Sequence, residues 1–479
     1  MAITSASQTR AAAVQATLSD NYLDIQNNGW AQQYLPDLME QEAEVFGKRT
    51  ISGFLAQVGA EEAMSADQVV WSEQGRLHLS YKGTIGTHTT STIQLDTDID
   101  GVDVGTTHGV RVGDTVLIAS AALTVRAFVS QINSDTNGDQ NTGATDFITA
   151  IPYDAEHLDN SGFGTNDAVT ILVYGSEHSK GTTGKVGANE PSFTSFTNKP
   201  IIMKDMYQVS GSDASQVGWV EVSGEDGQNG YMWYLKAEGD TRSRFADYTE
   251  MALVEAEKAA DASTILGGAN GLVGTEGLFS AISNRGHQTS GVTGVNAATD
   301  LAEFDAILAE FDKNGAIEEN MLFLNRATSL AFDDMLASMN SYGAGGTSYG
   351  VFDNNEDMAL NLGFSGFRRG SYDFYKSDWK YLNDLSTRGG INARNVAGAI
   401  RGVIIPAGTS SVYDEQMGKN LKRPFLHVRY RASQTESRKM KTWITGSVGA
   451  VTSDLDAMTV NFLTERCLVV QAANNFMLM

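Results

Sequence analysis

Cysteine and proline are both scarce in this 479-residue chain, which contains one cysteine and six prolines. The single cysteine, Cys467, excludes an intramolecular disulfide framework and a metal cage built from thiolates. It lies in an apolar run, where a buried and unreactive thiol is the usual state of cysteine. Because 49 glycines accompany so few prolines, we expect many tight turns and few stiff linkers. Stability must therefore come from buried side chains and from contacts with neighbouring subunits.

Positive charge is also in short supply. The chain has 34 Lys and Arg residues against 58 Asp and Glu residues, which gives a formal net charge of -24. Proteins that bind nucleic acid usually carry a basic surface, because they must neutralise phosphates. Any contact with DNA is therefore expected to be local or weak.

Long apolar runs and metal-binding spacings are missing as well. No apolar run approaches the ~18 residues that span a bilayer, and the first residues lack the charged start and apolar middle of a signal peptide. We therefore expect a soluble protein that is made in a cytoplasm and has no membrane partner. The seven histidines show no H-E-x-x-H spacing, so neither zinc nor another cofactor is expected.

The chain is long enough for two or three packed units, each with its own core. Residues 1–65 are polar and acidic, and a segment of this kind buries little by itself. One interpretation is a frayed terminus. The other is an arm that docks on a neighbouring subunit.

Short runs rich in Thr, Val and Ile fill residues 77–202 and are typical of strands and turns. The clearest strands are expected at residues 110–118, 124–132, 147–151 and 168–174. The first of these alternates apolar and polar side chains across a Gly-Asp kink, as strands of small barrels often do. We interpret residues 95–178 as a small β-barrel or sandwich inserted in a long hairpin. The alternative is a β domain placed in series.

Helical spacing replaces this pattern at residues 230–262, where Phe245, Tyr248 and Ala252 belong to one apolar stripe. A second helix is expected around residues 299–311. A third, at residues 325–339, follows a strand at 320–324, and residues 399–406 indicate a short buried strand. Helices and strands mixed in this way predict an α+β fold.

Two sequence patterns resemble functional sites, one catalytic and one metal-binding. Residues 346–350 match the G-x-S-x-G pattern of a hydrolase, with Ser348 as the nucleophile, but a glycine loop precedes them where that motif needs a strand. A flexible loop is the better interpretation. No catalytic residue is predicted, and the chain is not expected to be an enzyme.

The second pattern consists of three alternating carboxylates, Asp96, Asp98 and Asp100, which resemble the first half of a calcium-binding loop. The twelfth position of that loop is Thr107 instead of the expected glutamate, so the loop is incomplete. Calcium at these three residues is one hypothesis, and an acidic turn is the other.

Positive charge gathers near the end of the chain, where Glu436 is the main opposing residue. The cluster comprises Lys419, Lys422, Arg423, Arg429, Arg431, Arg438, Lys439 and Lys441. A solvated strand face is one interpretation. The other is a seam that pairs with the acidic arm of a neighbouring subunit, since opposite charges set the register between subunits. The candidate subunit-interface residues are Lys422, Arg423, Arg429, Arg431, Arg438 and Lys439.

The closing stretch, residues 425–479, alternates polar and apolar residues as strands of a mixed sheet do. Leu426, Val428 and Tyr430 carry the first alternation, and residues 440–451 and 458–463 lead into an apolar end. With the long helix at residues 230–262 and the acidic arm, this tail resembles the end of a tailed-phage major capsid protein.

The order of segments also resembles the shell fold shared by tailed phages and herpesviruses. The resemblance implies the following layout: residues 1–65 as an N-terminal arm, 66–94 and 179–224 as an extended-loop hairpin with flanking strands, 95–178 as an inserted β domain, 225–262 as the spine helix of a peripheral domain, 263–420 as an axial domain, and 421–479 as closing strands of both.

The same resemblance implies a structural virion protein that self-assembles into hexamers and pentamers of an icosahedral shell around double-stranded DNA. Its implied partners are copies of itself, a portal, a separate scaffolding protein, and DNA held by weak local contacts. It implies assembly in the host cytoplasm and a final location in the virion capsid. The alternative is a calcium- or carbohydrate-binding surface protein built around the β region.

Overall fold

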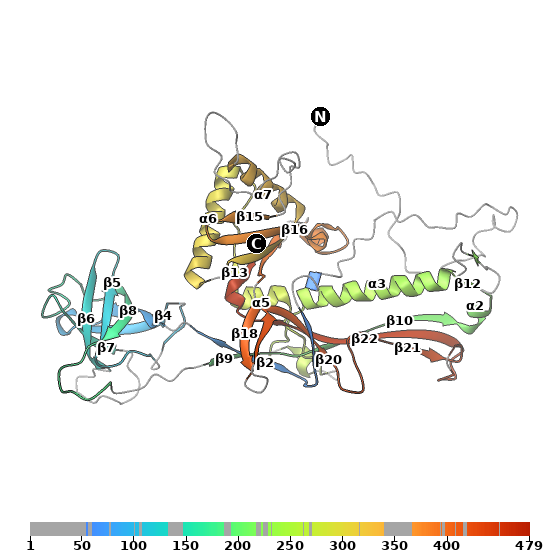
Figure 1. Cartoon of the computed structure of the whole chain (residues 1–479), viewed down its shortest axis with the longest axis horizontal. Coiled ribbons are helices and arrows are strands. Elements are labelled where there is room, and N and C mark those ends of the chain that lie inside the picture. The colour runs from blue at the N-terminus through green and yellow to red at the C-terminus, as the bar shows by residue number, and fades with distance from the viewer. Residues whose placement is uncertain are drawn as a thin grey trace. The chain divides into compact units, whose positions relative to one another are not determined.

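The structure of the protein is a computed structural model that divides into two compact units, Met1–Trp71 with Phe196–Met479 and Ser72–Ser195. It describes residues 54–55, 60–75, 78–99, 101–104, 108–132, 147–185, 193–216, 222–223, 229–230, 232–261, 263–267, 271–315, 317–339, 366–392, 394, 398–407, 409–414, 419–449 and 451–479. The described residues form more strand than helix (Figure 1). The α+β class predicted from the sequence is thereby confirmed.

The unit Ser72–Ser195 contains a closed six-stranded antiparallel barrel with the strand order β3-β4-β7-β6-β5-β8. Its strands are β3 (Ser80–Ile85), β4 (Thr92–Asp98), β5 (Asp114–Ala119), β6 (Thr124–Ile132), β7 (Phe147–Pro152) and β8 (Ala168–Ser176). A short 3-10 helix, η1 (His88–Thr90), joins β3 to β4. Alternate side chains point inward and form a mainly aliphatic core that includes Ile93, Ile118 and Ile148.

The barrel differs from the expected insertion at two places. β3 and β4, which had been assigned largely to the hairpin before residue 95, pair with β8 and β7 and so belong to the barrel. β5 begins at Asp114, four residues later than expected. Gly113 has a φ of +93° and the Asp114 amide donates to the Arg111 carbonyl, so the Gly-Asp kink is a turn before the strand.

In the larger unit, a five-stranded sheet follows the order β1-β20-β22-β10, with β21 also paired to β22. These strands are β1 (Glu61–Met64), β20 (Leu426–Arg431), β22 (Ala457–Val470), β10 (Ile201–Ser210) and β21 (Lys441–Gly446). The helix α3 (Met232–Glu255) runs along β10 and β22 (Figure 1). Phe245 of α3 packs against Val460 and Phe462 of β22.

The buried face of α3 differs from the stripe expected from the sequence. Tyr248 is exposed, whereas Thr241, Phe245 and Thr249 are buried. The two threonine hydroxyls donate to the carbonyls four residues earlier, Ala237 and Phe245, at 2.9 and 2.8 Å. This local bonding satisfies the hydroxyls, so residues that look polar in the sequence can face the sheet.

A second sheet of this unit has six strands in the order β13-β23-β17-β14-β16-β15. The strands are β13 (His287–Gln288), β23 (Met477–Leu478), β17 (Gly402–Pro406), β14 (Glu319–Leu324), β16 (Tyr372–Asp378) and β15 (Gly366–Arg369). The helices α6 (Ala297–Asn314) and α7 (Arg326–Met339) share its core, in which Phe304 contacts the rings of Phe332, Phe367 and Phe374. Asn296 caps α6, with its side chain accepting a hydrogen bond from the Thr299 amide.

The remaining elements are short. They are β2 (Val69–Gln74), β9 (Phe193–Asn198), β11 (Val222–Ser223), β12 (Asn229–Gly230), β18 (Thr409–Asp414), β19 (Lys419–Pro424), α2 (Gly211–Gln216), α4 (Thr264–Gly267), α5 (Leu278–Arg285), α8 (Lys380–Asn383), α9 (Arg388–Asn392) and η4 (Ala473–Asn475). β2 pairs with β9, and the chain enters and leaves the unit Ser72–Ser195 within these two strands.

The two ends of the described chain are both buried in the larger unit. The tail supplies β22 to the five-stranded sheet and β23 to the six-stranded sheet, and Met479 is buried. Within the predicted arm, Phe54 stacks on Trp379 with ring centroids 4.2 Å apart and meets the edge of Phe323 at 4.6 Å. Phe54 therefore belongs to a core, although residues 1–53 lie outside the described part of the chain.

Candidate functional site

Charged side chains meet where the short strand β1 joins the five-stranded sheet. β1 runs parallel to β20 and places Glu62 opposite Arg429, while β20 pairs with β22 and places Tyr430 opposite Arg466. We name this group the charged edge. It comprises Glu61, Glu62, Asp67, Arg429, Arg431, Arg438, Lys439, Glu465 and Arg466.

Ion pairs connect β1 and the turn after it to the centre of the sheet. Glu62 lies 2.7 Å from Arg429, and Glu61 lies 3.1 Å from Arg466 and also pairs with Lys439. Asp67 pairs with Arg431. Four residues of strand give few backbone hydrogen bonds, so we expect these pairs to contribute to holding β1 in register.

A fourth acidic residue of the charged edge lies inside the long strand β22. Glu465 is buried and lies 2.6 Å from Arg438 and 3.8 Å from Arg431. A buried carboxylate is tolerated only when paired, because removing a charge from water costs several kcal/mol per ion. The two arginines thus make it possible for β22 to carry a charge in an otherwise apolar run.

Burial shapes the protonation of the groups in this region. It lowers the pKa of the Arg466 guanidinium, while the nearby carboxylates of Glu61 and Glu250 act in the opposite direction. Burial also raises the pKa of the Cys467 thiol to about 12, and Arg429 opposes that shift only in part. The thiol is therefore protonated and unreactive at neutral pH, as its apolar sequence context predicts.

The predicted interface residues fall into two groups. Arg429, Arg431, Arg438 and Lys439 meet acidic residues of the same chain, which lie at the end of the predicted arm, just after it and in β22. Their pairing with a neighbouring subunit stays a prediction. Lys422 and Arg423 lie on β19, opposite Ser411 and Ser410 of β18, and their side chains are outside the described part.

Sequence reasoning missed the acidic half of the charged edge. Glu61 and Glu62 lie more than 360 residues before the cations they meet, so no local spacing connects them. Glu465-Arg466 did carry a signal, because two adjacent charges interrupt an apolar 14-residue strand. A charged pair inside such a strand indicates partners on both of its faces.

The calcium hypothesis rests on residues that the structure describes only in part. Asp96 accepts a hydrogen bond from the Thr84 hydroxyl at 2.6 Å, and Asp98 accepts one from the Val102 amide at 2.8 Å. Both carboxylates therefore accept hydrogen bonds from groups of the barrel unit itself. Asp100 lies outside the described residues. Among the residues described, no three His, Cys, Asp or Glu side chains gather as a metal site would need. Residues 346–350, with Ser348, also lie outside the described part.

A membrane-spanning helix is likewise not found in the described ranges, where each helix is too short or too polar to cross a bilayer.

Comparisons with known proteins give matches among solved structures. No protein-family model and no curated protein matches the chain. The chain is similar to a structure from Microbacterium phage Oxtober96, with 9% identity over 95% of this chain and 99% of that one and a TM-score of 0.37. It is also similar to the capsid structure of the cyanophage P-SCSP1u, with 8% identity over 64% and 80% of the two chains and a TM-score of 0.34.

A further similar structure is the asymmetric unit of the mature capsid of bacteriophage PhiM1, with 9% identity over 64% and 78% of the two chains and a TM-score of 0.34. Phage capsids, the family that the sequence resembles, are thus also among the solved structures to which this chain is similar. Because these TM-scores are below 0.5, we base the functional proposal on the geometry of the chain itself.

Proposed function

We propose that this chain is the major capsid protein of a tailed phage, a structural protein without enzymatic activity. In this proposal it self-assembles into hexamers and pentamers of an icosahedral shell that encloses double-stranded DNA. The observation that carries the proposal is the way the tail supplies β22 to the sheet beneath the long helix α3 and β23 to the six-stranded sheet. This arrangement is what the resemblance in the sequence implies for peripheral and axial domains closed by the same final strands.

The domain assignment follows from that arrangement. The five-stranded sheet with α3 corresponds to the peripheral domain, and the six-stranded sheet with α6 and α7 corresponds to the axial domain. β2 and β9 correspond to the base of the extended-loop hairpin, which carries the barrel as an insertion. The residues before β1 correspond to the N-terminal arm.

Unsatisfied strand edges support self-association. Among the described strands, β10 pairs only with β22, so one edge of this ten-residue strand has no partner there. Two apolar side chains on its outer face, Ile202 and Met206, are 55% and 59% exposed. Long edge strands with apolar side chains readily pair with another chain. A neighbouring copy in a shell is the occupant that the proposal assigns to this edge and face.

Net charge limits the contacts that we assign to DNA. A chain with a net charge of -24 repels packaged DNA over most of its surface, so we assign DNA only weak local contacts. A portal and a separate scaffolding protein complete the proposed partners, with assembly in the host cytoplasm and no membrane partner.

Sedimentation velocity of the purified full chain tests the proposal. We expect a concentration-dependent shift from monomers or capsomers to large particles. Replacing Met206 with lysine on β10 is expected to suppress the large particles without unfolding the protein, because the side chain is more than half exposed. Val102→Lys is the matched control, since Val102 is 64% exposed in the other unit and should have no effect.

A chain that stays monomeric at every concentration would contradict the proposal and favour the alternative, a calcium- or carbohydrate-binding surface protein. Equal loss of particles in both lysine variants would show that assembly does not depend on the β10 face.

A further inference from the structure

The outer face of the barrel carries apolar side chains where polar ones are expected. Side chains alternate in and out along barrel strands, and the outward positions normally meet water. On β6 and β7, Phe128 is directly opposite Ile151 on this outer face, and Ile151 is 42% exposed. Tyr153, directly after β7, and Tyr174, in β8, are 52% and 53% exposed. Exposed apolar side chains that gather on one face mark binding surfaces.

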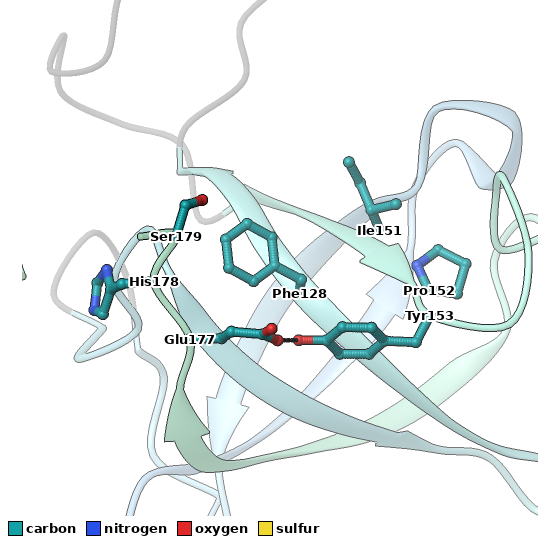
Figure 2. Close-up of a pocket in the computed structure, with 7 residues that line it drawn as sticks. All are labelled: Phe128, Ile151, Pro152, Tyr153, Glu177, His178 and Ser179. Carbon is teal, nitrogen blue, oxygen red and sulfur yellow. Dashed lines mark hydrogen bonds between the residues drawn. The ribbon is translucent and has the colours of Figure 1, made fainter. Parts of the chain in front are cut away.

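Phe128, Ile151 and Tyr153 border a shallow hollow of about 350 Å³. It is lined by Phe128, Ile151, Pro152, Tyr153, Glu177, His178 and Ser179. Figure 2 shows Phe128 in the middle of the group, with Ile151 and Pro152 on one side and His178 and Ser179 on the other. All seven residues belong to the unit Ser72–Ser195, so the hollow is complete within that unit.

One hydrogen bond holds the polar side of the hollow in place. The Tyr153 hydroxyl donates to Oε2 of Glu177 at 2.5 Å, as the dashed line in Figure 2 shows. This bond is the main reason that the pKa of Tyr153 is raised to about 12. The backbone of Glu177 is also fixed, because its amide donates to the Gly113 carbonyl at 2.9 Å. Oε1 of Glu177 has no hydrogen-bond partner among the described residues and remains an acceptor for a ligand.

The size of the hollow favours a small ligand. Pockets for small molecules measure roughly 300–1,000 Å³, whereas a stable protein interface takes roughly 20–30 residues from each partner. The volume of about 350 Å³ falls in the range of the first class. A single sugar unit of a glycan has a size that fits a small-molecule pocket of this volume.

Charge decides the class of ligand. The unit Ser72–Ser195 contains 15 acidic and six basic residues, which gives it a formal net charge of -9. None of the seven lining residues is Lys or Arg, although Arg126 lies next to the group, where its carbonyl accepts from the Tyr153 amide. A phosphate- or sulfate-bearing ligand would therefore meet a repulsive field. A neutral polyol would not.

We propose that this hollow binds a neutral sugar of a glycan. An aromatic ring offers an apolar face with a negative quadrupole to the C–H groups of a pyranose ring, and Phe128 and Tyr153 supply such rings. The sugar hydroxyls donate to Oε1 of Glu177, a charge-assisted bond of the stronger kind, and His178 offers a further donor or acceptor. This binding goes beyond the shell-forming function and does not depend on it.

The test applies the full-length chain to an array of neutral oligosaccharides of hexoses and N-acetylhexosamines, with heparin as the anionic probe. The strongest oligosaccharide is then titrated by calorimetry. We expect Glu177→Gln and Phe128→Ala each to weaken binding about tenfold or more, because each removes a contact of roughly that strength. Glu156→Gln is the matched control, since Glu156 is an exposed carboxylate of the same unit outside the hollow, and it should bind as the parent chain does.

Binding of heparin instead of neutral sugars, or no binding of any oligosaccharide at millimolar concentration, would overturn the proposal. So would sugar binding that Glu177→Gln leaves unchanged. Because Glu177 is exposed, that variant should fold even if Phe128→Ala does not. Particle formation is measured in parallel and should be the same in all variants, which separates failure of this site from failure of the capsid function.

Discussion

The barrel and the five-stranded sheet deal with their strand edges in opposite ways. Each barrel strand pairs on both sides, and its inward side chains form an aliphatic core. The sheet ends at β1, a four-residue strand with several ion pairs, at β21, and at β10, whose other edge has no partner among the described strands. Closure removes the edges that invite association, whereas an open sheet keeps them. We therefore expect the barrel to fold alone, and we propose that a neighbouring chain completes the sheet.

The largest expected effect concerns independent folding of the barrel unit and of the unit that contains the sheet. Residues 72–195 expressed alone should give a β-type circular dichroism spectrum and a cooperative thermal transition, because the barrel contains its own core. Replacing the barrel in the full chain with a short Gly-Ser link should leave a folded sheet unit, since loop length enters closure entropy only logarithmically. An unfolded isolated segment, together with an insoluble deletion variant, would show that the barrel and the sheet unit do not fold independently.

The next effect concerns the attachment of β1. Arg429→Glu would place a second carboxylate beside Glu62 and should lower the free energy of unfolding by about 2–3 kcal/mol, since both side chains of the pair are partly buried. Chemical denaturation of the full chain measures the change. The double variant Arg429→Glu with Glu62→Arg restores opposite charges and should recover much of the loss. If it does not, packing and not charge holds this strand.

The barrel and the charged edge could be predicted from the sequence to different depths. β6 was found at its full extent, Thr124–Ile132, because its side chains alternate locally. Closure by β3 and β4 was missed, because it depends on pairing with β8 and β7 far along the chain. The cations Arg429 and Arg431 stood out as a cluster in an acidic chain, but their partners Glu62 and Asp67 are visible only once the chain has folded.

A smaller effect should come from salt. Raising the ionic strength from 0.1 to 1 M shortens the Debye length from roughly 10 to 3 Å, so the partly exposed pairs at the charged edge weaken. The pairs of Lys439 with Glu61 and of Arg431 with Asp67 are of this kind. Cleavage after Glu61 and Glu62 by a glutamate-specific protease should accelerate with salt. Cleavage after Glu156 in the barrel unit serves as the internal control and should change little.

The smallest effect lies on the barrel surface. The hydrogen bond to Glu177 raises the pKa of Tyr153 to about 12, so the neutral phenol is favoured in the folded state. A group of this kind adds stability fully below its unfolded pKa of about 10, and the stability is lost as the pH rises through 10 to 12. Spectrophotometric titration should therefore show one less late-titrating tyrosine in Tyr153→Phe. An ordinary titration of Tyr153 near pH 10 would mean that the bond to Glu177 is absent in solution.

Electron cryo-microscopy of particles assembled from the purified chain is the most direct test of the proposed shell and of the role of β10 in it. We expect closed shells of hexamers and pentamers in which a neighbouring subunit covers the free edge and outer face of β10, around Ile202 and Met206, while the barrel keeps its closed fold. Monomers, or particles in which the β10 edge faces solvent in every subunit, would contradict it.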